Sequence, residues 1–239
     1  MLNIQDLTFS YGKGPNVLSH FSLNIEEGGV YGLLGKNGTG KSTLLYIIMG
    51  LLHAKEGSVK FKGLETKFRC PELLEDMFIV PEEYNLPAIP LKKYIASLKP
   101  FYPRFDEDML YRCLENFEMP TDINLGALSM GQKKKVYMCI ALAAKTRLLL
   151  MDEPTNGLDI PSKSQFRKIV AANTDPEQIV IISTHQVRDV ELLLDHVTMI
   201  EKNCVLVNDR MDNLFGDNEI INLEELFNQK LKEAKEKGE

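Results

Sequence analysis

Cysteines are few in this chain and show no pattern typical of a cross-linked or metal-binding protein. The 239 residues include four cysteines, at positions 70, 113, 139 and 204, and none of them forms a CxxC pair. Small secreted domains stabilised by disulfides are rich in cysteine, and zinc sites place their thiolates at short, regular spacings. We therefore expect reduced thiols in a cytosolic protein, with no disulfide framework.

Long apolar runs are also lacking. The two most apolar windows, LLYIIMGLL at 44–52 and VYMCIALAA at 136–144, are shorter than the roughly 20 residues that a spanning helix needs. The N-terminus, MLNIQDLTFSYG, has neither the basic start nor the apolar stretch of a signal peptide. We expect a chain that is soluble by itself, so that any work at a membrane would need another polypeptide to span it.

The sequence also lacks an excess of basic residues. Acidic residues outnumber basic ones by 34 to 28, which gives a formal charge of −6, and the run Lys133–Lys135 is the one obvious basic cluster. General nucleic-acid binders carry a basic surface that attracts phosphates. We therefore expect no nucleic-acid partner.

Short apolar segments that do occur have the periods of β-strands. LNIQDLTF at 2–9, the alternation of Phe21, Leu23 and Ile25, and SVKFKG at 58–63 predict an antiparallel sheet with one buried face. The continuous runs VYGLL at 30–34, LLLM at 148–151 and IVII at 179–182 are separated by helical segments. Such runs are typical of parallel strands covered on both faces, so we predict an α/β fold with a mostly parallel sheet flanked by helices.

The middle of the chain has a different composition. Residues 83–128 are rich in proline and aromatic residues and have apolar residues at helical spacing, which indicates a mostly helical insertion. The C-terminal segment begins as an amphipathic helix and ends in charged residues. We therefore expect an α/β core of residues 1–82 and 129–210, including an antiparallel β subdomain in 1–30 and 55–64, a helical subdomain at 83–128, and a C-terminal helix with a charged tail at 211–239.

The strongest chemical motif is GKNGTGKS at 35–42, directly after a predicted strand and before a predicted helix. It fills the pattern GxxxxGK[ST], whose glycines let the backbone approach an anion while amides at the helix N-terminus attract it. The lysine of this motif reaches the β- and γ-phosphates of a nucleotide, and its serine binds Mg²⁺. We predict nucleotide binding in a P-loop NTPase core by Gly35, Lys36, Asn37, Gly38, Thr39, Gly40, Lys41, Ser42 and Thr43.

Polar side chains also follow two other predicted strands. Asp152 and Glu153 end the run LLLMDE, and His185 follows IVIIST. Open α/β sheets bind ligands at the carboxyl ends of their strands. Asp152 is suited to hold Mg²⁺, Glu153 to orient or deprotonate an attacking water, and His185 to contact the γ-phosphate. Helix capping and ordinary packing are the alternatives for each residue taken alone, but their position beside the phosphate loop favours a hydrolase.

A hydroxyl, a glycine and an amide precede a helical run in LSMGQ, residues 128–132. Ser129 could simply cap this helix by accepting a hydrogen bond from a first-turn amide. The same amides can bind an anion, so capping and a functional role are compatible.

In order and spacing, these motifs resemble those of the ATP-binding cassette (ABC) ATPases of ABC transporters, over nearly the whole chain. The family has an aromatic residue near the N-terminus, the phosphate loop, a glutamine loop, a helical subdomain, an LSGGQ-type signature, an Asp-Glu strand end, a D-loop and a switch histidine. Here these correspond to Tyr11, GKNGTGKS, VPEE, residues 83–128, LSMGQ, LLLMDEPT, NGLD with Asp159, and STH with His185.

The resemblance implies a role for each motif. Tyr11 would stack on adenine, and Lys41, Glu153 and His185 would serve hydrolysis. The signature, Ser129, Met130, Gly131 and Gln132, would hold the γ-phosphate of ATP bound to a second cassette. The partner would thus be another copy or a similar chain. ATP and Mg²⁺ are the implied cofactors, with Ser42, Asp152 and Glu82 near the metal.

Two positions depart from the family pattern. Glu82 replaces the usual glutamine, which retains an oxygen for Mg²⁺ but adds negative charge and loses an amide donor. Met130 replaces a common glycine in the signature. Both substitutions put in doubt how tightly two cassettes would close on ATP.

The family further implies an integral membrane permease as partner, which would place the chain in the cytoplasm, on the inner face of the cell membrane. TNGLDIPSK and STHQVRD look similar to bacterial ATPases that work with exporter-like permeases, which favours an exporter-like system. A soluble ABC ATPase in metal-cluster assembly is the alternative, and co-purification with a membrane protein would distinguish the two. A catalytically inactive regulatory role conflicts with the presence of Glu153 and His185.

Overall fold

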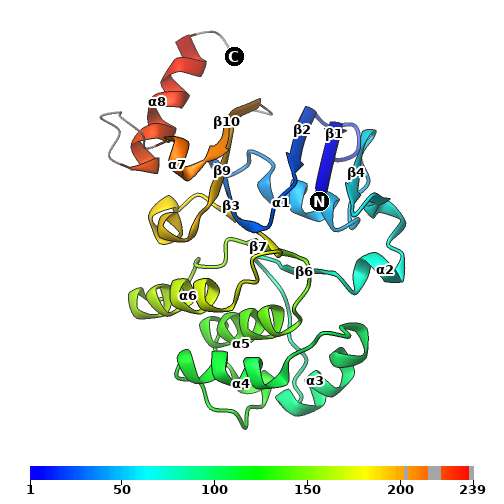
Figure 1. Ribbon diagram of the computed structural model, residues 1–239, viewed down its shortest axis with the longest axis vertical. Helices are drawn as coiled ribbons and strands as arrows, with labels where there is room; N and C mark the ends of the chain where they lie inside the picture. Colours follow the sequence, from blue (N-terminus) through cyan, green and yellow to red (C-terminus); the bar gives the residue numbers. More distant parts are fainter. Residues whose placement is uncertain (202–203, 215–221, 237–239) are drawn as a thin grey trace.

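The computed structural model describes residues 1–201, 204–214 and 222–236 (Figure 1). A sheet of six strands forms the centre of the chain, in the order β10-β9-β3-β8-β7-β6. Neighbouring strands pair in parallel except β10, which runs antiparallel to β9. The strands are β3 (Gly29–Leu34), β6 (Met77–Val80), β7 (Leu148–Asp152), β8 (Ile179–Thr184), β9 (His196–Glu201) and β10 (Cys204–Arg210).

A second, antiparallel sheet of four strands is built mostly from the N-terminal part of the chain. Its order is β2-β1-β4-β5. Buried and exposed side chains alternate along β2, as expected for a sheet with one covered face. The strands are β1 (Leu2–Phe9), β2 (Leu18–Ile25), β4 (Glu56–Phe61) and β5 (Leu64–Glu65).

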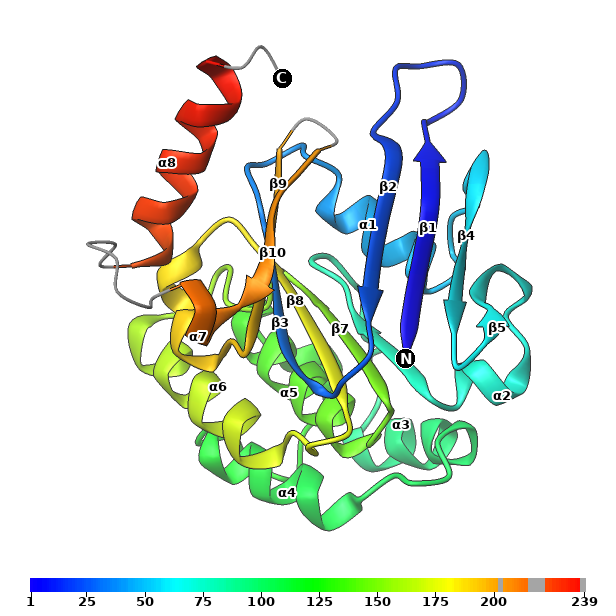
Figure 2. The same cartoon turned by 45° about the horizontal axis from the view of Figure 1, so that its top comes forward.

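Two apolar cores cover the two faces of the six-stranded sheet. Helix α1 (Lys41–Ile48) lies between the two sheets, where Tyr31 and Leu33 of β3 join the core that contains β1 and β2 (Figure 2). Val30 and Leu34 point to the other side and pack in the core formed with the helices. Successive residues of one strand thus enter opposite cores, which explains why the sequence of β3 is apolar throughout.

The second core includes helices of the insertion and the helices that follow it. Helix α5 (Met130–Ala143) packs against α4 (Glu107–Asn116), and α6 (Ile160–Asn173) lies beside them (Figure 2). The remaining helices are α2 (Pro71–Leu74), α3 (Leu91–Leu98), α7 (Met211–Leu214) and α8 (Leu223–Glu236). Single 3₁₀ turns occupy Thr66–Phe68, Lys99–Phe101, Leu125–Ala127, Val187–Asp189 and Glu191–Leu193.

The predicted fold class is confirmed, and the runs at 30–34, 148–151 and 179–182 are β3, β7 and β8. The sequence analysis did not identify β6, β9 or β10 as strands. β6 is four residues long and too short to show a period, and β9 and β10 form a hairpin at the edge of the sheet. Residues 215–221 and 237–239 of the segment predicted as a C-terminal helix and charged tail lie outside the described residues.

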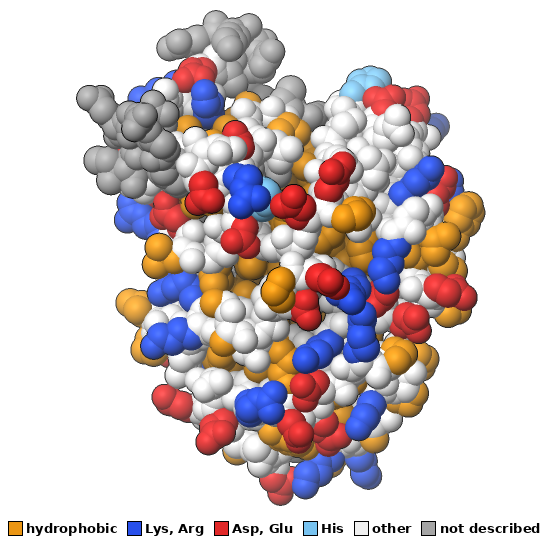
Figure 3. Space-filling model, in the orientation of Figure 1, with side chains coloured by type: hydrophobic (Ala, Val, Ile, Leu, Met, Phe, Trp, Pro, Cys, Tyr) orange, Lys and Arg blue, Asp and Glu red, His pale blue; other side chains and the backbone are white. Residues whose placement is uncertain are grey.

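Cys70, Cys113 and Cys139 are free thiols, and the side chain of Cys204 lies outside the described residues. Within the described part of the chain, no helix combines the length and apolarity that crossing a membrane requires. On the face shown in Figure 3, basic side chains are interspersed with acidic ones.

Candidate nucleotide-binding site

The carboxyl ends of β3, β7 and β8 meet at one edge of the central sheet. Leu34 pairs with Thr184, and Asp152 pairs with Ser183, so these strands end almost in register. The segments that follow them therefore begin side by side, although they are far apart in the sequence. A cavity of about 490 Å³ lies at this edge, lined by Tyr11, Val17, Asn37, Gly38, Gly40, Lys41, Ser42, Thr43, Glu82, Glu153, Asn156 and His185.

The phosphate loop between β3 and α1 depends on glycine at defined positions. Gly38 and Gly40 have φ values of +82° and +94°, which side chains disfavour. A Cβ on Gly35 would lie 2.7 Å from the carbonyl oxygen of Ile200, too close to fit. Gly40 is the N-cap of α1 and supplies no side chain to cap it. Gly40 therefore offers no side-chain acceptor to the first-turn amides of α1. Amides that no side chain caps can bind an anion at a helix N-terminus.

Lys41 is almost completely buried under this loop. Its Nζ donates hydrogen bonds to the carbonyl oxygens of Gly35 at 2.8 Å and Lys36 at 3.0 Å, and lies 3.8 Å from Glu153 Oε1. Burial lowers the pKa of Lys41, and the carboxylates of Glu153, Asp152 and Glu82 oppose that shift. The lysine thus places a cation beside the helix N-terminus, where both attract phosphate.

Asp152 ends β7 with one carboxylate oxygen unsatisfied. The residue is 1% exposed, and Ser183 Oγ donates a hydrogen bond to its Oδ1, whereas Oδ2 has no hydrogen-bond partner among the residues that the structure describes. Burial raises the pKa of Asp152, while the hydroxyls of Ser183 and Ser42 lower it. A buried oxygen without a partner, close to the Ser42 hydroxyl, fits a hard cation such as Mg²⁺.

By themselves, these oxygens are too few to hold a metal ion. The described residues contain no group of three or more His, Cys, Asp and Glu that could hold a metal ion by themselves. Mg²⁺ is usually bound by one or two carboxylates together with substrate phosphates and water. Ser42 and Asp152, with Glu82 at the cavity wall, are therefore suited to hold the ion together with a nucleotide.

Glu153 follows Asp152 in a left-handed backbone conformation, with φ of +45°. Its Oε1 accepts a hydrogen bond from the His185 amide at 3.0 Å and lies 2.8 Å from His185 Nδ1. Its Oε2 accepts a hydrogen bond from Thr184 Oγ1 at 3.0 Å. These three donors come from the end of β8 and hold the carboxylate at the wall of the cavity.

Glu82 and Tyr11 lie at the rim. Glu82 Oε1 accepts a hydrogen bond from Asn156 Nδ2 at 2.9 Å, which ties the segment after β6 to the turn after β7. Tyr11 is 55% exposed, and its hydroxyl lies 3.0 Å from Thr43 Oγ1. Its ring meets that of Phe9 edge to face, with centroids 4.9 Å apart, so the tyrosine also packs against an aromatic side chain of β1.

The signature residues and Asp159 do not line this cavity. Ser129 Oγ accepts a hydrogen bond from the Gln132 amide, and Gln132 Oε1 accepts one from the Ser129 amide, which forms a capping box at the start of α5. Met130 is 65% exposed beside it. Asp159 caps α6 through the Ser162 amide, at 2.9 Å. The structure therefore shows the capping role of Ser129 directly and places the signature at the surface.

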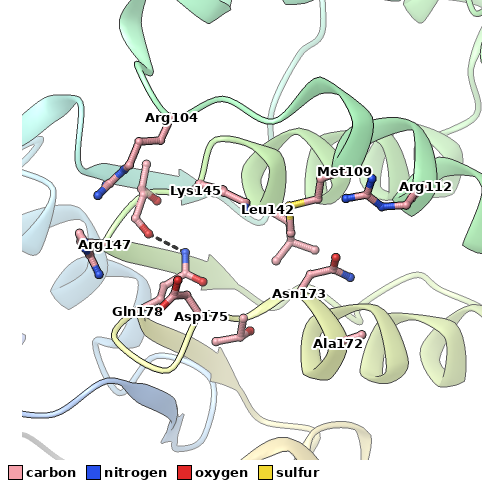
Figure 4. A pocket seen from close by; sticks show the side chains of 12 residues that line it. Arg104, Met109, Arg112, Leu142, Lys145, Arg147, Ala172, Asn173, Asp175 and Gln178 are labelled. Carbon is pink, nitrogen blue, oxygen red and sulfur yellow. Dashed lines mark hydrogen bonds between the residues drawn. The ribbon is translucent and has the colours of Figure 1, made fainter.

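A second cavity, of about 390 Å³, lies at the opposite edge of the sheet, near the amino ends of β7 and β8 (Figure 4). Its basic residues already have acidic partners: Arg104 with Asp76, Lys145 and Arg112 with Asp106, and Arg147 with Glu177. Helices α5 and α6 also end here, and carbonyls at a helix C-terminus repel anions. Ion pairs within the fold therefore explain why these four basic residues lie at the second cavity.

Several residues at the first cavity were missed in the sequence analysis. Val17 and Asn156 line the cavity and Thr184 contacts the Glu153 carboxylate. Val17 belongs to no motif, and Asn156 and Thr184 lie within NGLD and STH, in which only Asp159 and His185 were assigned roles. Lys134 is buried behind it, and nothing in the sequence distinguishes this lysine from Lys133 and Lys135.

Comparisons with known proteins place the chain among cassette ATPases. The ABC transporter family model matches residues 18–156. The lantibiotic transport ATP-binding protein SrtF of Streptococcus pyogenes is 32% identical over 233 residues, which cover 97% of each chain. The ABC transporter ATP-binding protein YtrB of Bacillus subtilis (strain 168) is 29% identical over 192 residues; the match covers 80% of this chain but 65% of that protein's length. A solved ATP-binding subunit of an ABC transporter, 23% identical, has the same fold, with a TM-score of 0.84 over 96% of this chain and 99% of that one.

Proposed function

Because the chain belongs to the ABC transporter family, whose members are ATPases coupled to transport, we propose that it binds and hydrolyses Mg-ATP to drive a separate membrane-spanning partner. The observation that carries this proposal is the meeting of three groups at the carboxyl end of the sheet. The buried Lys41, with the start of α1, and the carboxylate of Glu153 line the cavity, and the unpartnered oxygen of Asp152 belongs to a carboxylate beside the Ser42 hydroxyl, which also lines it.

Each group has a distinct task in the proposed reaction. Lys41 and the first amides of α1 would bind the phosphates and offset the charge that develops as the γ-phosphoryl group leaves. Mg²⁺, held with Ser42 and Asp152, would supply further positive charge to those phosphates. Glu153 would accept a proton from the attacking water, and His185, 2.8 Å from its carboxylate, would fix its orientation and contact the γ-phosphate.

One chain would form only part of the nucleotide site, and a second chain would complete it. The signature lies at the exposed N-terminus of α5 and outside the cavity, so it is available to another molecule. In the two-cassette arrangement, the first amides of α5 would hold the γ-phosphate of the partner's nucleotide. This arrangement predicts two shared sites in a symmetric dimer.

Ser129→Asp separates this role from capping. Aspartate is as good an N-cap as serine, so α5 should stay intact. Its negative charge would face a phosphate, however, and like charges brought together cost several kcal/mol. We expect hydrolysis to fall by roughly 100-fold with an unchanged melting temperature. Ser129→Asn, which also caps but adds no charge, is the matched control; equal turnover in Ser129→Asp and the wild type would restrict Ser129 to capping.

Mixing two inactive variants tests the shared sites. In a mixed dimer of Lys41→Ala and Ser129→Asp chains, one site combines an intact phosphate loop with an intact signature, and the other combines both defects. Each variant alone should be inactive, and the mixture should recover part of the wild-type rate. A mixture as inactive as its components, under conditions in which the two chains associate, would contradict the shared-site proposal.

We propose that the transporter is exporter-like and that this chain lies on the inner face of the cell membrane. One relative is described as a lantibiotic transport protein, which agrees with transport. Pull-down of the chain from membranes extracted with mild detergent should recover an integral membrane protein. Recovery of soluble metal-cluster proteins in its place would favour the alternative, metal-cluster assembly.

Glu82→Gln tests the first departure from the family pattern. Removing this carboxylate from the cavity wall should weaken binding of Mg²⁺ and restore an amide donor. We expect the Mg²⁺ concentration for half-maximal hydrolysis to rise by about 3- to 10-fold, the effect of a weak outer ligand. A titration of hydrolysis against Mg²⁺ at saturating ATP measures it, and an unchanged midpoint would exclude Glu82 from the metal site.

A further inference from the structure

Lys134 is a buried lysine on α5 to which no motif assigns a role. It is 8% exposed, between two more exposed lysines of the same helix. Its Nζ donates hydrogen bonds to the carbonyl oxygens of Glu153 and Asn156, both at 2.9 Å. Burial lowers the pKa of Lys134, whereas the carboxylates of Glu82, Glu153 and Asp152 raise it. Removing an ammonium from water is costly, so its two acceptors and the surrounding acids must compensate.

The acceptors of Lys134 belong to the turn that begins with Glu153. A non-glycine residue in the left-handed region costs of order 1–3 kcal/mol, and it persists only where its surroundings fix it. On one side of Glu153, its amide donates to the Ser183 carbonyl oxygen at 2.9 Å. On the other side, its own carbonyl oxygen accepts from the Asn156 amide at 3.1 Å and from Lys134. Lys134 therefore fixes the peptide group that follows Glu153.

The second acceptor extends this network to the rim of the cavity. Asn156, whose carbonyl oxygen accepts from Lys134, uses its side chain to donate to Glu82. One ammonium thus orients the backbone at both ends of the turn that separates Glu153 from Asn156. Because Lys134 lies on α5, this turn is attached to the same helix that begins at the signature.

We propose that Lys134 is a positioning residue for hydrolysis: by holding the carbonyl oxygens of Glu153 and Asn156, its ammonium keeps the Glu153 carboxylate aimed at the cavity. It also joins the turn that carries this base to the helix that would hold the partner's nucleotide. The inference rests on the proposed role of Glu153 as base. The proposed effect is on the chemical step and not on nucleotide binding, since Lys134 does not line the cavity.

Lys134→Met tests the proposal because methionine retains much of the side-chain volume and removes the charge and the donors. Small displacements of a catalytic group cost up to about 100-fold, so we expect kcat to fall by about 10- to 100-fold. The dissociation constant for ATP should stay within about threefold of the wild-type value, since the phosphate loop is intact. Lys134→Arg, which retains donors and charge, should recover part of the loss.

Lys133→Met is the matched control. Lys133 precedes Lys134 on the same helix, and its side chain has no hydrogen bond or ion pair with any described residue. Near-wild-type kcat is expected for this variant. A folded Lys134→Met protein with wild-type kcat, or an equal loss in Lys133→Met, would overturn the proposal.

A double variant distinguishes positioning from general destabilisation. If Lys134 acts through Glu153, adding Lys134→Met to Glu153→Gln should slow hydrolysis no further, because the base it positions is already absent. An additional loss of the same size in the double variant would assign Lys134 a role independent of Glu153 and overturn the proposal. Near-normal turnover in Glu153→Gln alone would instead refute Glu153 as base, so the two failures are distinguishable.

Discussion

Glu153→Gln is expected to bind Mg-ATP normally and to hydrolyse it ~10²–10⁴ times more slowly than the wild type, an increase in barrier of about 3 to 5 kcal/mol. Glutamine retains the size of glutamate; its oxygen can accept a hydrogen bond from His185 in place of Oε1, and its NH2 group can donate one to the Thr184 hydroxyl oxygen in place of Oε2. It cannot take a proton from water, however. The loss should therefore appear in kcat and not in nucleotide affinity.

Steady-state phosphate release and a separate nucleotide-binding titration measure these two quantities. Glu115→Gln, on the exposed surface of α4, is the control for removal of a carboxylate, and it should behave as the wild type. Turnover of Glu153→Gln within a few-fold of the wild type would mean that another group activates the water. The role of His185 as its orienting partner would then also be withdrawn.

Lys41→Ala has the second large expected effect, on binding itself. Hydrogen bonds to charged groups contribute about 1.5–3 kcal/mol, so loss of this ammonium should raise the dissociation constant for ATP by about 10- to 100-fold. Hydrolysis should be lost with it, because the same cation stabilises charge on the phosphates as they react.

Because Lys41 is buried, its replacement could also disturb the loop through a cavity. Lys41→Met preserves most of the side-chain volume and should bind ATP as weakly as Lys41→Ala. Lys168→Ala, at an exposed position on α6, controls for the loss of one positive charge from the chain. Unchanged ATP affinity in both Lys41 variants would contradict the assignment of the phosphate loop.

The parts of the fold that the sequence predicted are those encoded locally. The continuous apolar runs of β3, β7 and β8 report burial on both faces of a sheet, and the glycine pattern of the phosphate loop reports its backbone angles. The family that the motif order indicated is confirmed by the comparisons. Short edge elements such as β6 and β10 were missed, because tertiary pairing and not local pattern makes them strands.

The site contains contacts that no sequence pattern encodes. His185 and Glu153 are separated by 32 residues along the chain, and their contact follows only from the pairing of β7 with β8. Lys134 shares its residue type with both neighbours, and the helical rotation that buries it is set by the packing of α5. In the case of Ser129, the sequence left capping and nucleotide contact as compatible alternatives; the capping box is now visible, and the second role stays a prediction.

In the proposed arrangement a second cassette completes the nucleotide site, and light scattering on the Glu153→Gln protein would detect that association. This variant should retain bound ATP long enough for the closed state to accumulate. We expect a monomer without nucleotide and a dimer of twice its mass with Mg-ATP, a shift that Ser129→Asp in the same background abolishes. A protein that binds Mg-ATP and hydrolyses it in the wild-type form, yet stays monomeric with a rate per chain independent of protein concentration, would contradict this arrangement.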